Sequence, residues 1–328
     1  MKEDDIRPAD LYRRYLELNE ADAVAYFSAS ERKDLPCPAC DSALIEPAFE
    51  KSSFGLALCR NCDTLFQSPR PPREDFALFY QGSSSARYWA KTFFPAVAEA
   101  RRQNLFRPKV ERIAQLCQEE GFLPQVLADI GAGYGIFLEE WRYKFPRTEL
   151  IAIEPHPDLA ARCRAKNFVV QECFAEEARA IHGHVDMVVA QEVIEHVHSP
   201  LVFCASLWQL LRQGGKLLLT DLTVSGFDIQ ILWEYSRSIC PPLHLNFMSI
   251  RGFQYLLARA GFRNIRIFTP GNLDVDIVKN TVAENPQILN GQRFISHLLS
   301  QDEATLAEFQ KFLSEHRLSS HCWIWAEK

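Results

Sequence analysis

Short apolar runs alternate with stretches of helical periodicity between residues 124 and 270. A parallel strand buried on both faces forms a continuous apolar run, whereas an amphipathic helix repeats apolar side chains every three or four residues. Strands separated by helices at this spacing predict an α/β fold, with a parallel sheet covered by helices on both faces. The expected strands are QVLADI, ELIAIE, NFVVQ, VDMVVA, GKLLLT and NIRIF.

The flanking sequence follows other patterns. Apolar positions at helical spacing within residues 11–28 predict an N-terminal amphipathic helix, and the Pro-rich sequence SPRPPRE marks a boundary. The C-terminal part is mostly helical in pattern and ends in HCWIWAEK, a candidate strand for the same sheet. We therefore expect an N-terminal helical segment (1–34), a cysteine ribbon (35–72), a helical linker or lid (73–120), the α/β core (121–270), and C-terminal helices with a final strand (271–328).

Composition narrows the class of protein. With 47% apolar and 12% aromatic residues, the chain can build a large core. The formal net charge of -6 disfavours nucleic acids and anionic membranes as partners. The N-terminus lacks a signal-peptide pattern, and no apolar run approaches the roughly 20 residues of a membrane span. A cytoplasmic protein with no membrane association is the expectation.

Two cysteine pairs stand between residues 35 and 72. Cys37 and Cys40 flank two residues, Cys59 and Cys62 flank two more, and 18 residues separate the pairs. Two such knuckles let four thiolates meet tetrahedrally around one Zn²⁺. Because four protein ligands leave no position for water, a structural rather than catalytic zinc is expected. Residues 31–72 carry five basic and six acidic side chains, which favours a structural or substrate-capping module over one that binds nucleic acid.

A glycine-rich loop follows the first expected strand, in VLADIGAGYGIFLEEW. Glycines there permit positive φ and close approach of a ligand to the backbone. A dinucleotide fingerprint needs its third glycine three residues after the second, but residue 136 is Ile. DIGAGYG instead resembles the first motif of class I S-adenosylmethionine-dependent methyltransferases. The resemblance implies a Rossmann-like seven-stranded sheet and cofactor contacts from Asp129, Gly131, Ala132, Gly133, Gly135, Glu154 and Gln191.

Glu154 has a reason of its own to be among these residues. It ends the second expected strand, in IAIEP, where a carboxylate can accept hydrogen bonds from both ribose hydroxyls. The family uses an acid at this position for the same purpose.

The stretch VDMVVAQEVIEHV resembles the fourth-strand motif of the same family, which places Gln191 and Glu192 beside the transferable methyl group. If a helical turn begins there, Glu192, Glu195 and His196 share one face. Three roles for His196 stay open. It can act as a general base, ligate a divalent cation with Glu192 and Glu195 as similar ExxEH stretches do in some methyltransferases, or pack as the start of a helix.

A second histidine follows the fifth expected strand. CPPLHLNFMSIRGFQYLLARAGF resembles a family segment in which a His precedes an aromatic residue, a Ser helix cap and a helix ending at Gly. His244 is therefore expected to face His196 across the substrate entrance, and both are candidate catalytic residues with Glu192 and Glu195.

The order of segments resembles zinc-ribbon methyltransferases of sugar and surface-polysaccharide biosynthesis, related to the deoxysugar C-methyltransferases. The resemblance implies a small-molecule acceptor, a sugar or nucleotide sugar, methylated on oxygen or carbon. Residues 73–112 carry eight basic against four acidic residues, which fits a phosphorylated substrate or simply an exposed helix face. The alternatives are a ribosomal-RNA methyltransferase and a cofactor-binding scaffold that has lost catalysis.

Overall fold

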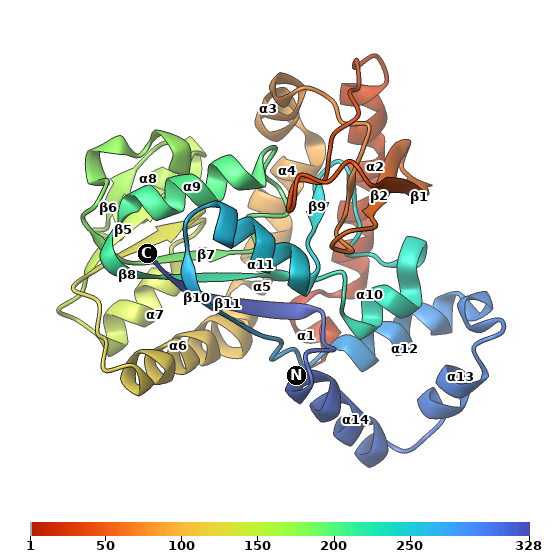
Figure 1. Cartoon of the computed structure of the whole chain (residues 1–328). Coiled ribbons are helices and arrows are strands. Elements are labelled where there is room, and N and C mark those ends of the chain that lie inside the picture. Colours follow the sequence, from red (N-terminus) through yellow and green to blue (C-terminus); the bar gives the residue numbers. More distant parts are fainter. Residues whose placement is uncertain (1) are drawn as a thin grey trace.

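The computed structural model describes residues 2–328, in which seven strands form a mixed sheet of order β10-β11-β8-β7-β4-β5-β6 (Figure 1). Every strand except β11 runs parallel to the others. The α/β prediction is confirmed, and each expected apolar run contains a strand. The bounds are β4 Val126–Ile130, β5 Glu149–Ile153, β6 Val169–Gln171, β7 Val185–Gln191, β8 Leu211–Leu222, β10 Arg263–Phe268 and β11 His321–Glu327.

Helices cover both faces of this sheet. On one face α6 and α7 enclose the apolar cluster that holds Leu127 and Met187, and on the other α9 and α11 enclose the cluster that holds Ala128 and Val188 (Figure 1). Successive residues of one strand thus enter opposite cores, as the alternation of a pleated strand requires. The helices are α6 Arg107–Glu119, α7 Ile136–Lys144, α8 Pro157–Ala165, α9 Pro200–Leu210 and α11 Ile250–Arg259.

The last strand of the chain is part of the same sheet. β11 inserts antiparallel between β8 and β10, with Trp325 opposite Leu218 on one side and Arg266 on the other. Its pattern, HCWIWAE, is almost wholly buried, because both neighbours and both layers of helices cover it. The 271–328 segment therefore completes the core sheet.

A second, antiparallel sheet of order β1-β2-β3-β9 carries the cysteine pairs. Its first three strands come from the ribbon, whereas β9 follows His244 in the core sequence. The ribbon is thus hydrogen-bonded to the loop that presents the second candidate histidine. The bounds are β1 Ile45–Lys51, β2 Phe54–Cys59, β3 Leu65–Gln67 and β9 Asn246–Phe247.

Helices before and after the core complete the fold. The expected N-terminal helix is α2, and the lid region is a run of helices that includes two π-helical turns, η1 and η2. Among the described residues, no helix has the length and apolarity needed to cross a bilayer. The bounds are α1 Glu3–Ile6, α2 Ala9–Phe27, α3 Arg73–Gly82, α4 Ser84–Tyr88, η1 Trp89–Phe93, α5 Phe94–Arg101, η2 Arg102–Phe106, α10 Phe227–Leu232, α12 Asp274–Glu284, α13 Arg293–Leu299 and α14 Glu303–Glu315, with short 3-10 turns η3 Ala175–Glu177, η4 Arg179–Ile181, η5 Trp233–Tyr235 and η6 Pro286–Leu289.

Candidate active site

The crevice at the carboxyl ends of β4 and β7 holds the candidate active site. The sheet order reverses at β4, which pairs with β5 on one side and β7 on the other. Ligands of open α/β sheets bind where the order reverses. The loops after these two strands carry the glycines and the acid and histidine residues singled out from the sequence. Of the second motif, Gln191 and Glu192 line the same cavity as the glycines, whereas Glu195 and His196 lie beyond its lining.

The glycine loop forms a tight turn between β4 and α7. Gly131, Gly133 and Gly135 have φ values of 68°, 55° and 68°, in the left-handed region that L side chains rarely adopt. A Cβ on Gly131 would lie 3.0 Å from Cγ2 of Val193, in the loop after β7. Gly135 is the N-cap of α7. Gly131 thus keeps the backbone bare where the two loops approach each other, and Gly135 does so where the turn packs on Cys163 and Phe168.

A cavity of about 220 Å³ lies beside this loop. The sheet contributes Asp129 and Gln191, and the opposite wall comes from the lid region. Ring stacking holds that wall against the loop, since Phe94 and Tyr134 lie parallel with ring centroids 4.4 Å apart. The lid residues around the cavity are Trp89, Ala90, Phe94, Arg101, Leu105, Phe106 and Lys109.

Glu154 at the end of β5 faces the glycine loop. Its carboxylate accepts hydrogen bonds from the N–H groups of Gly133, at 2.8 Å, and His156, at 2.9 Å. Burial raises the pKa of Glu154, and these two hydrogen bonds act against the rise. An acid at this place can hold a ribose, and the assignment to the cofactor stays a prediction.

Asp129 lies at the back of the same cavity and is 3% exposed. Burial raises its pKa to about 8, while a hydrogen bond from Gln191 and the charge of Lys109 act in the opposite direction. The side chain is therefore largely protonated near neutral pH and can donate as well as accept a hydrogen bond.

The segment after β7 is a turn and not the helical start considered from the sequence. Residues 192–198 lack helix, and α9 begins only at Pro200. The physical reason is twofold. Glu192 has a φ of 53°, outside the helical range, and the Asn246 amide binds the carbonyls of Ile194 and Val197, at 3.2 and 2.9 Å, in place of helical N–H donors.

The turn nevertheless gathers acidic side chains. Oxygen atoms of Glu192, Glu195 and Asp221 lie within 4.8 Å of one another. Burial favours the neutral form of Glu192, but the charges of Lys109 and His321 outweigh it and lower its pKa to about 2. Burial and the neighbouring Glu192 raise the pKa of Glu195 to about 8, and burial raises that of Asp221 well above its usual range. The cluster therefore holds its negative charge on Glu192.

His196 and His244 face each other, with ring centroids 4.8 Å apart. Nδ1–H of His196 donates to the Leu243 carbonyl at 2.9 Å, and Nδ1–H of His244 donates to the Ser238 carbonyl at 2.7 Å. Because a carbonyl can only accept, both Nε2 atoms carry free lone pairs. Burial lowers the pKa of His196, and burial together with His196 lowers that of His244 to about 3. Both imidazoles are neutral, ready to accept a proton or a cation.

Sequence reasoning missed several groups of this site. His321 on β11 lies 3.7 Å from Oε1 of Glu192, and Lys109 on α6 lies 3.4 Å from the same oxygen. Thr220, which donates to it at 3.0 Å, and Asp221 lie near the carboxyl end of β8. An acid at the carboxyl end of the expected strand GKLLLT was a signal for Asp221, whereas His321 and Lys109 are far away in the sequence and carry no motif.

The four cysteines converge as predicted. Their sulfur atoms all lie within 4.8 Å of one another, with 3.5 Å between Cys37 and Cys62 and 3.6 Å between Cys40 and Cys59. Tetrahedral zinc with Zn–S bonds of about 2.3 Å places its sulfurs about 3.8 Å apart, so this donor set fits zinc. The cluster packs into the same apolar core as α9 and α11.

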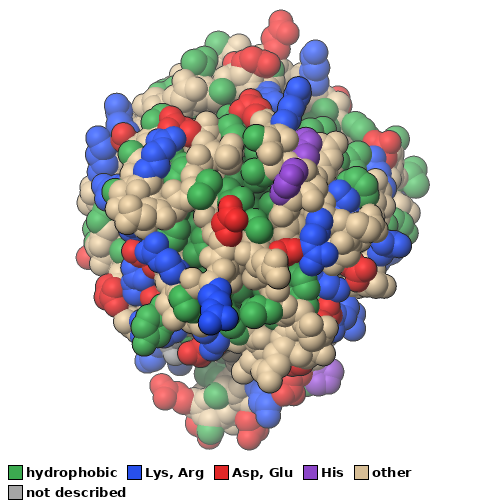
Figure 2. Space-filling model, turned by 90° about the vertical axis from the view of Figure 1, so that its left-hand side faces the viewer, with side chains coloured by type: hydrophobic (Ala, Val, Ile, Leu, Met, Phe, Trp, Pro, Cys, Tyr) green, Lys and Arg blue, Asp and Glu red, His purple; other side chains and the backbone are tan. Residues whose placement is uncertain are grey.

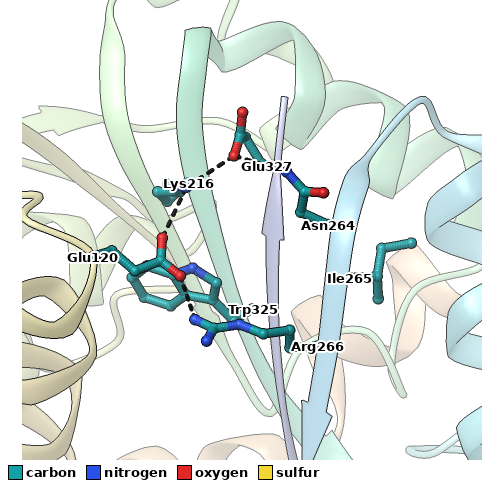
Figure 3. Close-up of a pocket in the computed structure, with 7 residues that line it drawn as sticks. All are labelled: Glu120, Lys216, Asn264, Ile265, Arg266, Trp325 and Glu327. Atoms are coloured by element: carbon teal, nitrogen blue, oxygen red, sulfur yellow. Dashed lines mark hydrogen bonds and ion pairs between the residues drawn. The ribbon is translucent and has the colours of Figure 1, made fainter.

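A second hollow lies at the opposite end of the sheet (Figure 3). There Lys216 on β8 binds Glu120 and Glu327, each at 2.9 Å, and Arg266 binds Glu120. These charges satisfy one another at the amino ends of the parallel strands. This hollow therefore does not compete with the cavity beside the glycine loop as a site of chemistry.

Comparison with known proteins assigns the fold and site to a class. The family model described as a methyltransferase domain matches residues 98–267, more than half of the 328-residue chain. The chain belongs to this methyltransferase family, and the prediction of an S-adenosylmethionine-dependent methyltransferase is confirmed.

Individual relatives are more distant. The tRNA U34 carboxymethyltransferase of Pseudoalteromonas atlantica is 28% identical over 134 residues, which cover 38% of this chain and 36% of that protein. Among solved structures, the plantazolicin methyltransferase BamL, in complex with a triazolic desmethylPZN analog and SAH, is 11% identical with a TM-score of 0.51. That match covers 77% of this chain and 94% of BamL. The methyltransferase BpumL is similar at 13% identity and a TM-score of 0.50, over 77% and 93% of the two chains. The expected likeness to sugar methyltransferases is not among these findings.

Proposed function

We propose that the chain methylates a small-molecule acceptor, a sugar or nucleotide sugar, on an oxygen or carbon atom. The supporting observation is that N-terminal helices lie against the candidate catalytic groups and cover them in part. Tyr80 of α3 lies 3.4 Å from Nδ1 of His196, and Asn19 of α2 binds the carbonyl of Pro241, three residues before His244, at 3.1 Å. A small acceptor fits beneath these N-terminal helices more readily than a folded RNA.

In this proposal the glycine loop, Glu154, Asp129 and Gln191 hold the cofactor, which supplies an electrophilic methyl group on a sulfonium. The loop fits that task because Gly131 and Gly133 line the cavity and the buried acids Asp129 and Glu154 lie beside the loop. The four cysteines hold a structural zinc, in keeping with their spacing.

His196 is proposed to act as general base. Its Nε2 lone pair accepts the proton of the acceptor O–H or C–H group as the new bond to the methyl carbon forms. Loss of the methyl group would leave the cofactor's sulfur as a neutral thioether, so charge would balance when the imidazolium forms. Glu192, the ionised acid of the cluster, favours that charge, whereas the neutral Glu195 lies 3.7 Å from Nε2 and can accept a hydrogen bond from this nitrogen once it is protonated. His244 keeps a second lone pair 4.8 Å away, ring centre to ring centre.

A cation at the same residues is the competing proposal for their role. Atoms of Glu195, His196 and His244 also lie within 4.8 Å of one another. Histidines that ligate metals usually donate their other N–H to a carbonyl, as both histidines do here. A divalent ion at this point would bind the acceptor oxygen and lower its pKa.

RNA is the second candidate acceptor, because one relative is by its name a tRNA enzyme. The face shown in Figure 2 intersperses Lys and Arg side chains with Asp and Glu and has no continuous basic track. The net charge of -6 also favours the small-molecule proposal.

The deciding experiment follows a labelled methyl group. The protein and methyl-labelled S-adenosylmethionine are added to a cell extract, which is then separated into ultrafiltrate, protein and RNA. Label in the ultrafiltrate above that of an extract without added protein supports the proposal. Label in RNA would establish the second candidate, and cofactor binding without label in any fraction would establish the scaffold alternative.

A further inference from the structure

Arg101, the last residue of α5, is a partly buried cation, two of whose nitrogen atoms are buried without a hydrogen-bond partner within residues 2–328. Its side chain lines the cavity beside the glycine loop. The Nε and Nη1 atoms are buried and have no hydrogen-bond partner within residues 2–328. The flat guanidinium lies over the rings of Trp89 and Phe94, with its central carbon 5.8 and 5.6 Å from their centroids. Aromatic faces hold the group in place but leave its N–H donors unused.

The neighbouring arginine shows the contrast. Nη2 of Arg102 binds Glu139 at 2.7 Å and Nη1 binds Glu140 at 2.8 Å, so this guanidinium has carboxylate partners that Arg101 lacks within residues 2–328. Unsatisfied donors of a buried charge cost free energy unless a ligand completes them. The unpaired donors of Arg101 therefore lower the stability of the folded chain as long as no ligand binds them.

The backbone around Arg101 is unusual in the same way. The π-helical turns η1 and η2 flank α5 directly, and both contribute residues to the cavity wall, Trp89 and Ala90 from the first and Leu105 and Phe106 from the second. Such turns change the direction of side chains within a helix and occur frequently at functional sites. Here they aim one face of the lid into the cavity.

Charge in the cavity points to the chemistry of the missing partner. Burial, together with the nearby guanidinium of Arg7, lowers the pKa of Arg101 to about 10, and it stays cationic at neutral pH. Lys109 adds a further cation, whereas Glu192 is the acid that is ionised there. The cavity therefore has an excess of positive charge.

We propose that Arg101, supported by Lys109, is the anion-binding residue of this site and holds a carboxylate or phosphate group of a ligand through a bidentate contact. Planar guanidinium groups pair with such oxyanions through two parallel hydrogen bonds. This assignment rests on the proposed function. The bound oxyanion has two possible sources: the carboxylate of the cofactor's amino-acid part, or an anionic group of the acceptor.

The test compares wild type, Arg101→Gln and Arg101→Lys with a control, Arg112→Gln, which removes an exposed arginine from α6. Calorimetry measures binding of S-adenosylhomocysteine and of 5′-methylthioadenosine, which lacks the amino-acid part. If Arg101 holds the cofactor carboxylate, Arg101→Gln weakens S-adenosylhomocysteine at least about tenfold but not methylthioadenosine. Arg101→Lys keeps the charge but lacks the two parallel N–H donors, so we expect it to recover part of the affinity for S-adenosylhomocysteine.

A second arm tests the acceptor as the source. Pyrophosphate raises the melting temperature of the wild type saturated with S-adenosylhomocysteine, and Arg101→Gln abolishes that rise. If Arg101→Gln and wild type bind S-adenosylhomocysteine equally well and respond equally to pyrophosphate, the inference is overturned. If wild type binds neither nucleoside, the proposed function fails, and the pyrophosphate shift of the free protein still decides on Arg101. The melting temperature of the unliganded Arg101→Gln variant checks its fold. Because the substitution removes an unpaired charge, we expect this melting temperature to equal or exceed that of the wild type.

Discussion

At the scale of single residues, the two histidines of the site share one hydrogen-bonding arrangement. Each gives its Nδ1 proton to a backbone carbonyl of the 238–243 loop, which fixes both ring orientation and tautomer. Burial lowers both pKa values, so both imidazoles are unprotonated at Nε2 at neutral pH. A base held in this way stays unprotonated, and therefore active, at pH values below the usual pKa of histidine.

This arrangement predicts the effect of removing either ring. His196→Ala and His244→Ala should each lower kcat by about tenfold or more, the low end of what a general base contributes, while affinity for S-adenosylhomocysteine stays unchanged. His198→Ala is the matched control, since that ring turns away and its Nε2 lies 3.1 Å from the Pro71 carbonyl. Unchanged kcat in both alanine variants would refute the assignment.

The choice between base and cation ligand needs its own measurement. For a base, kcat of the wild type is insensitive to chelators and falls only as pH drops below about 6.5, because burial lowers the pKa of His196. If instead a chelator abolishes turnover and Mg²⁺ restores it, the residues Glu195, His196 and His244 hold a cation.

At the scale of elements, the ribbon and the active-site loops form one connected unit. Arg70, three residues after the end of β3 and 2% exposed, donates to the carbonyls of His198, at 2.7 Å, and Leu245, at 3.0 Å. It also binds Oδ1 of Asn246 at 2.9 Å. One buried side chain thus joins the cysteine ribbon to both loops that carry the candidate histidines. Zinc in the ribbon should therefore affect turnover from a distance.

Cys40→Ser tests that connection. Cys40 is the least buried of the four thiols, so the exchange removes a ligand with little loss of packing. We expect zinc content to fall, the free energy of unfolding to drop by more than about 4 kcal/mol, and kcat to fall with it. Cys173→Ser, a partly exposed cysteine outside the cluster, should change none of these. Full zinc content and stability in Cys40→Ser would contradict the structural role.

The sequence was sufficient for elements and insufficient for long-range contacts. Apolar runs located the strands because burial on both faces leaves a local pattern, and cysteine spacing located the metal site because each knuckle is local too. The turn that begins at Glu192 was not foreseeable, because Asn246, whose amide binds carbonyl groups of the turn, is about fifty residues away in the sequence. Arg101 carries no motif, and only the packing of α5 on the glycine loop shows that it is unpaired.

At the scale of the whole molecule, the interior holds an uncommon set of neutral acids. Burial raises the pKa of three carboxyl groups to about 8: Asp129, Glu195 and Asp228. Two of them lie in the site, but Asp228 lies outside it on α10, 0% exposed, with neither oxygen hydrogen-bonded to a donor within residues 2–328. The shared cause is burial, which disfavours the charged form of each carboxyl group.

These acids predict a loss of stability as pH rises from about 6.5 to 8. In that window the unfolded carboxyl groups are ionised while the folded ones keep their protons, so the folded state binds more protons and each group costs up to about 1.4 kcal/mol per pH unit. Histidines with lowered pKa are neutral in both states there and do not contribute. Asp228→Asn should therefore be more stable than wild type at pH 8 and show a shallower slope in denaturant unfolding, with no difference below about pH 4. The exposed pair member Asp10→Asn is the control. Parallel curves for Asp228→Asn and wild type would mean that Asp228 is ionised in the folded protein.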